Sequence, residues 1–223
     1  MKIVHKGFNL TMSLNENQVT VLSVENVHAY TEILRDIWNQ VQGGDGGFIF
    51  SDKEKVIKIS KAVDCVFNPF SLKCNDRKII NHLYQQIKEQ ADSFFLEETM
   101  KMNTQLNQFM DDLLFQIPYA LKHNQELDIT NLLKLYDVEF ECSAETVLEQ
   151  VIEYLRIMSK ICGINIYVFV GLKQFLSTEE LKELYKFAFY EKIRILIIEP
   201  VHTPLIEGEK GWIIDPDLCI IEL

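Results

Sequence analysis

A cluster of basic residues is the first feature of this sequence that could support chemistry. Seven of them fall between positions 53 and 78: Lys53, Lys55, Lys58, Lys61, Lys73, Arg77 and Lys78. Lysine binds phosphate as a point charge, so the cluster predicts a partner that is rich in phosphate. In an extended segment, Lys53, Lys55 and Lys58 could share one side. Because lysines on an edge strand also protect a sheet against aggregation, that plainer role stays open.

The second candidate is a polar loop, His123-Asn124-Gln125-Glu126-Leu127-Asp128. Its carboxylate and amide oxygens are of the kind that bind Ca²⁺, which takes about six to eight oxygen ligands from flexible groups. The loop does not have the spacing of an EF-hand, so a solvated turn is the alternative.

Catalytic patterns are missing at the positions where they would be expected. The glycine-rich stretch 43–47 follows a helix and leads into a strand, whereas a phosphate-binding loop ends in Lys-Ser/Thr and opens a helix. We therefore interpret it as a flexible connection. After the strand at 18–24 the chain has the helix cap Asn26 and no glycine, and the strand at 166–170 ends in Val-Gly without a Mg²⁺-binding acid. Hydrolysis of a nucleotide by a standard site is not expected.

The composition indicates a globular protein with an uneven charge distribution. The chain has 223 residues, 48% of them hydrophobic, and a net charge of −11. Residues 52–78 hold six Lys and one Arg against four acids, a sum of +3, while residues 79–153 hold four Lys and fourteen acids, a sum of −10. No apolar run approaches the ~20 residues of a membrane span, and no signal peptide is evident, so we expect a cytoplasmic protein. The five cysteines have no metal-binding or disulfide spacing, and we expect buried thiols.

The hydrophobic periodicity predicts an α/β fold with a parallel sheet. Residues 165–171 and 194–200 are apolar strands joined by a helix from Ser177 to about Tyr190, which is a βαβ unit. Further strands are expected at 2–12, 18–24, 48–50, 63–67 and 218–221. Helices are expected at 27–41, where Asn26 is the cap, and at 144–161.

A long helical stretch interrupts this pattern. From Asp76 to Pro118 the apolar residues recur at three- and four-residue spacing, with a break near Glu97, and a short helix is expected to begin at Asp128 or Thr130. Because such a length exceeds what a compact α/β domain needs, we predict an inserted helical extension. The expected division is 1–75 with 138–223 for the α/β domain, and 76–137 for the extension.

Several stretches resemble a known family, the small CRISPR-associated proteins of type II-A systems that act in spacer acquisition (the Csn2 family). The similar stretches are 53–58, the helical insertion from about 76, the acidic loop before 131–134, and a C-terminal block at 145–149, 166–170, 175–180, 195–200 and 212–215. The resemblance rests on the order and spacing of these stretches, because none of them contains a catalytic motif.

The resemblance implies a fold and a function. Members of the family have an α/β head related to P-loop ATPases but lacking the phosphate loop, and an α-helical leg. They form ring-shaped homotetramers, bind Ca²⁺, and thread the ends of double-stranded DNA through a basic hole, and they are not known as enzymes. By position, the seven basic residues become DNA-binding candidates, and Glu126 and Asp128 become Ca²⁺ ligands.

We therefore expect a non-catalytic DNA-end-binding protein of CRISPR spacer acquisition that works with other adaptation proteins and needs no nucleotide or membrane. The alternative is a degenerate P-loop-like interaction module that binds a nucleotide or a protein partner. A hydrolase is a third option, which no group of residues supports.

Overall fold

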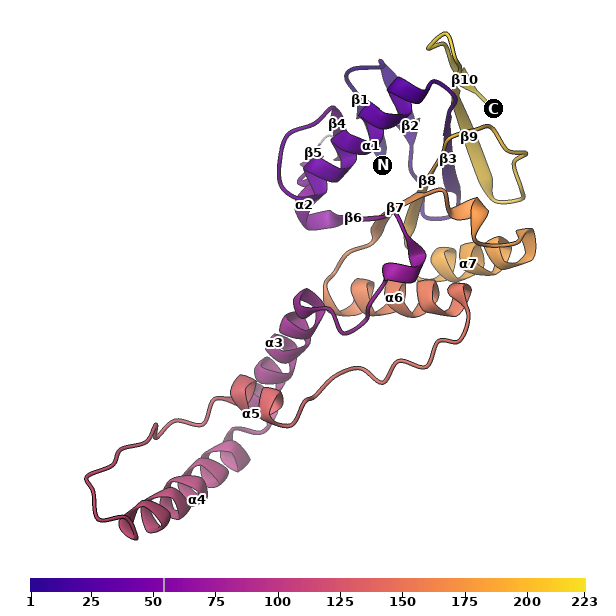
Figure 1. The fold of residues 1–223 in the computed structure, drawn as a ribbon. Helices are drawn as coiled ribbons and strands as arrows, with labels where there is room; N and C mark the ends of the chain where they lie inside the picture. Colours follow the sequence, from indigo (N-terminus) through magenta and orange to yellow (C-terminus); the bar gives the residue numbers. More distant parts are fainter. Residues whose placement is uncertain (54) are drawn as a thin grey trace. The chain divides into compact units, whose positions relative to one another are not determined.

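The computed structural model describes residues 1–53 and 55–223, so Glu54 of the lysine-rich stretch lies outside the described residues. By its internal contacts the chain divides into two units (Figure 1). The α/β unit comprises 1–74 and 142–223, and the helical unit comprises 75–141. The sequence places these boundaries at 75/76 and 137/138.

The α/β unit is built on a six-stranded sheet with the order β10-β9-β3-β8-β7-β6. Its strands are β3 (Val19–Val24), β6 (Val63–Val66), β7 (Ile166–Val170), β8 (Arg194–Glu199), β9 (Glu209–Ile214) and β10 (Ile220–Glu222). All neighbours are parallel except β9 and β10. β3 is buried along its whole length, as expected for a strand with parallel neighbours on both sides and covered faces. The predicted βαβ unit and the α/β class are confirmed.

Three helices of the α/β unit begin at side-chain caps that the sequence signals. They are α1 (Val27–Val41), α6 (Val147–Ile161) and α7 (Thr178–Tyr190). The predicted caps Asn26 and Ser177 are confirmed, and α6 begins at Val147 after the cap Thr146, three residues later than the predicted Ala144. Thr146 and Ser177 form reciprocal capping boxes with Glu149 and Glu180.

A second, antiparallel sheet has the order β2-β1-β4-β5. Its strands are β1 (Lys2–His5), β2 (Leu10–Ser13), β4 (Phe48–Asp52) and β5 (Lys55–Ile57). The single strand predicted at 2–12 is wrong, because the chain reverses there into a β1–β2 hairpin with Asn9 in the left-handed region (φ 49°). Ile33 of α1 packs in one apolar core with residues of both sheets, among them Phe50 and Leu22. This core fixes the position of the β4–β5 hairpin.

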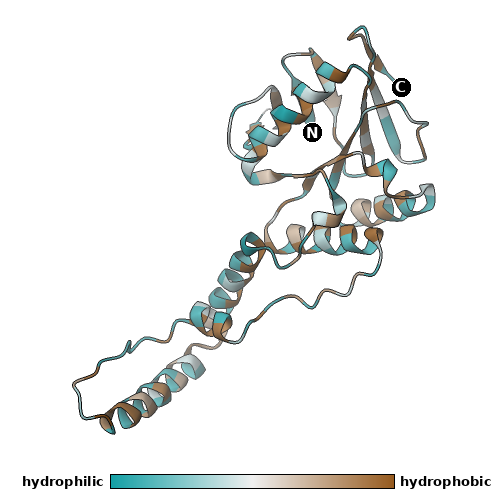
Figure 2. Cartoon of the chain, in the orientation of Figure 1, coloured by the Kyte–Doolittle hydropathy of each residue, from teal (hydrophilic) through white to brown (hydrophobic). Residues whose placement is uncertain are grey.

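The helical unit contains α3 (Arg77–Phe94), α4 (Leu96–Phe115) and α5 (Ile129–Leu135). The break between the long helices falls at Phe95, close to the predicted Glu97, and Asp128 caps α5. No residue of α4 is buried, although the helix carries many apolar side chains along its length (Figure 2). None of the helices in the described part of the chain combines the length and the apolar character needed to cross a bilayer.

Candidate nucleic-acid interface

The first four lysines of the basic cluster lie on two consecutive elements of the α/β unit. Lys53 occupies the turn after β4 with a left-handed backbone (φ 44°), and Lys55 begins β5. Lys58 is the N-terminal cap residue of the short helix α2 (Ile59–Ala62), and Lys61 follows one turn later. The expectation that Lys53, Lys55 and Lys58 share one extended segment is wrong for Lys53, which lies in the turn before β5. Lys55 and Lys58 do lie on extended backbone, and the helix begins only at Ile59.

These positions separate the two interpretations of the lysine run. β5 is an edge strand of the antiparallel sheet, so protection against aggregation explains Lys55. Lys58 and Lys61 lie beyond the strand, and residues three apart share a helix side. Edge protection does not account for them.

The four lysines are exposed, and no acidic side chain of the described residues forms an ion pair with them. Some other basic side chains of the same unit are paired, such as Lys160 with Glu191 and Arg194 with Glu16, each at 2.6 Å. Unpaired, exposed ammonium groups keep their full charge available for a phosphate.

The remaining three basic candidates are distributed over both units. Lys73 is exposed and follows the short helix η1 (Pro69–Ser71) in the α/β unit. Arg77 and Lys78 are exposed at the first turn of α3 in the helical unit. Basic residues are unfavourable at a helix N-terminus, where the macrodipole is positive, although the cap Asp76 offsets this. Residues that go against such a local preference, as Arg77 and Lys78 do at this helix N-terminus, often mark a functional site.

The predicted Ca²⁺ ligands do not assemble into a site. One carboxylate oxygen of Asp128 accepts the Thr130 N–H at 2.9 Å, which is a helix-capping role. Glu126 is exposed, and its N–H donates to Asn124 at 3.2 Å. Among the described residues, neither carboxylate belongs to a group of three or more potential metal-ligating side chains. The pair supplies far fewer oxygens than Ca²⁺ takes, so these residues do not fit the ion as a self-contained site.

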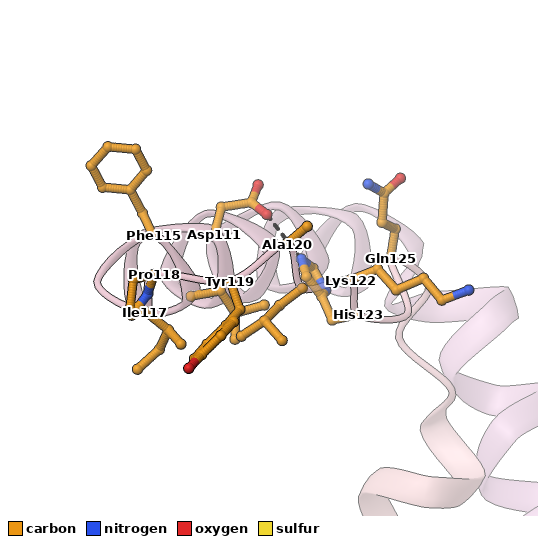
Figure 3. A pocket seen from close by; sticks show the side chains of 11 residues that line it. Asp111, Phe115, Ile117, Pro118, Tyr119, Ala120, Lys122, His123 and Gln125 are labelled. Carbon is orange, nitrogen blue, oxygen red and sulfur yellow. Dashed lines mark hydrogen bonds and ion pairs between the residues drawn. The ribbon is translucent and has the colours of Figure 1, made fainter.

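The neighbouring loop forms a hollow with one solvent-accessible ion pair at its edge, in which the Asp111 side chain is 71% exposed. Residues 117–125 run back along α4 and enclose about 640 Å³ with Asp111, Leu114 and Phe115 (Figure 3). His123 Nε2 lies 2.9 Å from Asp111 Oδ1, and this hydrogen bond raises the pKa of the imidazole. Most of the other lining side chains are apolar, so the hollow contributes no basic patch beyond Lys122.

The place where a phosphate loop would stand is closed by a side chain. β3 leads directly into α1, and Asn26 Oδ1 accepts hydrogen bonds from the N–H groups of His28 and Ala29, each at 3.1 Å. Asn26 Nδ2 also donates to the Pro216 carbonyl at 2.9 Å. Because these N–H groups would have to face a phosphate, this helix end is not arranged to bind a nucleotide.

The glycine-rich stretch is anchored, and its interpretation as a flexible connection is corrected. The Gln40 side chain donates to the Phe48 carbonyl and accepts from the Phe48 N–H, both at 2.9 Å, and Asp36 accepts from the Gly47 N–H at 2.7 Å. A Cβ on Gly47 would lie 2.6 Å from the buried His5 ring. A Cβ on Gly46 or Gly47 would also lie 2.8 Å from Asp36, so these two glycines are needed for close packing against α1 and His5.

The expectation of buried thiols is correct for only one cysteine. Cys74 is buried, Cys65 and Cys162 are half-buried, and Cys142 and Cys219 are exposed. The fold brings Cys74 and Cys142 together with Glu153. A separation of 68 positions between the two cysteines gives no sequence signal for this cluster.

Together these features define an α/β protein with a helical insertion, an exposed lysine set and no phosphate loop after its first parallel strand. The family model described as CRISPR-associated protein (Cas_Csn2) matches residues 40–218, which is most of the chain. The chain belongs to the Csn2 family of CRISPR-associated proteins.

One curated relative agrees with this assignment, and similar solved structures are also found. A CRISPR-associated protein Csn2 of Streptococcus agalactiae is 20% identical over 211 residues, covering 92% of this chain and 91% of that protein. The crystal structure of Stu0660 of Streptococcus thermophilus is similar with a TM-score of 0.64 and 12% identity, covering 100% of this chain and 76% of the other. The ATP-binding cassette MJ0796, bound to ADP and Pi, reaches a TM-score of 0.41 at 12% identity over 92% and 84% of the two chains. The likeness to Stu0660 supports the α/β fold.

Proposed function

We propose that the protein binds double-stranded DNA, preferably at its ends, as a non-catalytic component of CRISPR spacer acquisition. Membership of the Csn2 family supports this function. The observation that carries it is the set of Lys53, Lys55, Lys58 and Lys61, exposed and without an ion pair in the described part of the chain. On a chain with a net charge of −11, such a set is a local attraction for phosphate within a surface that otherwise repels it.

The helical unit supports a proposal of self-association. α4 has no buried residue, and several of its large apolar side chains are more than half exposed: Met100 at 59%, Phe109 at 61%, Leu113 at 52% and Phe115 at 88%. Extended exposed apolar surface marks interaction sites. We propose a homotetrameric ring in which this surface is covered by other copies and the lysines of four chains line the hole.

This proposal assigns no role to Ca²⁺, because Glu126 and Asp128 do not provide enough oxygen ligands for the ion among the described residues. We propose that the protein acts together with other adaptation proteins in spacer acquisition. This takes place in the cytoplasm, where the invading DNA is captured.

A gel-shift titration tests both the binding and the ring. It compares a linear duplex with a covalently closed circle of the same length and sequence. Binding of the linear form alone is expected, because a ring gains access only through a free end. Equal binding of both forms would show a lateral basic surface and refute the ring. No binding of either form would refute the DNA-binding function and favour an interaction module.

Charge reversal tests the lysine set. The variant Lys53→Glu/Lys55→Glu/Lys58→Glu is compared with Lys182→Glu/Lys186→Glu/Lys192→Glu, which changes the charge by the same amount at other exposed lysines of the α/β unit. The first variant should lose affinity and flatten the salt dependence by about 0.9 in log K against log salt for each lost phosphate contact. An equal loss in both variants would mean that only the total charge matters.

A further inference from the structure

Three side chains with metal-binding chemistry meet in the α/β unit, apart from the lysine set. The ligand atoms of Cys74, Cys142 and Glu153 all lie within 4.8 Å of one another. Cys74 is buried, Glu153 is half-buried and Cys142 is exposed. Within residues 1–53 and 55–223 this is the one group of three or more such side chains that is close enough to share an ion.

The three residues come from separate segments that are tied together by hydrogen bonds. Gln150, one turn before Glu153 on α6, donates its Nε2 to the Leu72 carbonyl at 2.9 Å, two residues before Cys74. This bond holds the Glu153 helix against the Cys74 segment.

Hydrogen bonds also connect the residues next to the two cysteines, on the side of the helical insertion. Asn75 Nδ2 donates to the Phe140 carbonyl at 3.0 Å, and the Phe140 N–H donates to Asn75 Oδ1 at 2.9 Å. Asn75 follows Cys74 directly, and Phe140 comes two residues before Cys142. Hydrogen bonds therefore restrain the chain on both sides of Cys74 and on the N-terminal side of Cys142, as a preorganised metal site needs.

Two thiols and a carboxylate select a particular class of ion. Zn²⁺ binds thiolate sulfur at about 2.3 Å and carboxylate oxygen at about 2.0–2.2 Å in tetrahedral geometry. Two such sulfurs are then roughly 3.8 Å apart. Ligand atoms within 4.8 Å of one another reach this spacing by small side-chain rotations. Ca²⁺ and Mg²⁺ prefer oxygen ligands and are disfavoured by the thiols.

Thiols release their protons on binding zinc, and the half-buried and exposed members of the cluster can exchange these protons with solvent. The site is accessible, since Glu153 also lines a groove of about 680 Å³ between α6 and α7.

We propose that Cys74, Cys142 and Glu153 form a zinc site with a fourth position open to solvent. The chain enters the helical insertion directly after Cys74 and leaves it directly before Cys142. The ion would therefore join the two chain passages at which the insertion begins and ends, and fix their separation in the α/β unit.

Cobalt spectroscopy and zinc analysis of the full-length protein test the site. Metal-free, reduced protein is titrated with Co²⁺, and a thiolate-to-cobalt charge-transfer band with the visible bands of a tetrahedral ion is expected at one equivalent. Zinc should displace the cobalt and remain bound at one ion per chain through gel filtration. Absence of the charge-transfer band would overturn the proposal.

Matched variants assign the ligands. Cys142→Ser changes an exposed residue, so the fold should persist, and it should lower the band to that of at most one thiolate and weaken zinc binding by more than about tenfold. Glu153→Gln should weaken binding but keep the band, and Cys219→Ser, an exposed cysteine outside the cluster, should change neither. A band of unchanged intensity in Cys142→Ser refutes the site. A Cys74–Cys142 disulfide that persists under reducing conditions, detected by mass spectrometry, would also refute it.

Discussion

The buried pair of Lys173 and Glu209 allows a sharp prediction about the stability of the α/β unit. Lys173 follows β7, and its Nζ lies 2.8 Å from Glu209 Oε2 at the start of β9. Only 8% of the lysine side chain and none of the glutamate side chain are exposed. Glu209 also accepts from the Tyr185 hydroxyl at 2.6 Å and from the Ile206 N–H at 2.9 Å. The substitution Lys173→Met removes the charge partner and leaves the carboxylate buried.

The expected cost follows from this burial. Removing one partner of a buried ion pair costs about 3–5 kcal/mol, because the remaining charge is uncompensated. With a urea m-value on the order of 2 kcal/mol/M, the unfolding midpoint should fall by roughly 1.5–2.5 M. The control Lys160→Met breaks the pair with Glu191, in which the lysine is 63% exposed. It should cost less than about 1 kcal/mol.

Tryptophan fluorescence in urea measures the effect, because Trp38 and Trp212 both lie in the α/β unit. The protein concentration must be the same for all variants, since self-association would add to the apparent stability. Equal shifts for Lys173→Met and Lys160→Met would refute the reasoning, because they would mean that burial of the pair does not matter.

Two other features give further predictions. The hydrogen bond that His123 Nε2 donates to Asp111 raises the pKa of the imidazole. The stabilising contribution of this pair should therefore be complete below about pH 6.5 and lost as the pH rises through the raised pKa. An NMR titration of the imidazole should show the raised value, and Asp111→Asn should lower it; an unchanged value would contradict the pair. Gly47→Ala should destabilise by about 1–3 kcal/mol through overpacking, because its Cβ would lie 2.6 Å from His5. Gly44→Ala, where the nearest atom is 3.3 Å away, is the control in the same urea assay and should cost less.

The sequence predicts those parts of the fold in which local signals agree with the tertiary structure. The βαβ unit was predictable because β7 and β8 are continuous apolar runs on either side of a capped helix. The cap Asn26 stands directly before an amphipathic pattern, and the boundaries of α1 match the prediction. The hairpin inside residues 2–12 was missed because its turn, Lys6–Asn9, contains none of the usual two-residue turn pairs.

The candidate site was predictable only as a list of residue types. The lysines could be found from their spacing, but the turn at Lys53, with its left-handed backbone, has no clear sequence signal, so the shared side of Lys53 and Lys58 was wrong. The cluster of Cys74, Cys142 and Glu153 brings together residues that the whole insertion separates in the sequence. No local sequence pattern predicts a contact over such a separation. The role of Glu126 and Asp128 came only from the family resemblance, and whether they bind a metal stays a prediction.

The order of strands in the large sheet determines when the protein can fold during synthesis. The central strand β3 ends at residue 24, yet both of its neighbours, β8 and β9, lie between residues 194 and 214. Only the small antiparallel sheet and α1 can pack while the ribosome is still making the insertion. β3, whose residues are all buried, therefore stays without its neighbouring strands until residues 194–214 have been translated, which exposes the nascent chain to aggregation. A chain that stops before residue 194 would lack both neighbours of β3 and leave its apolar residues uncovered.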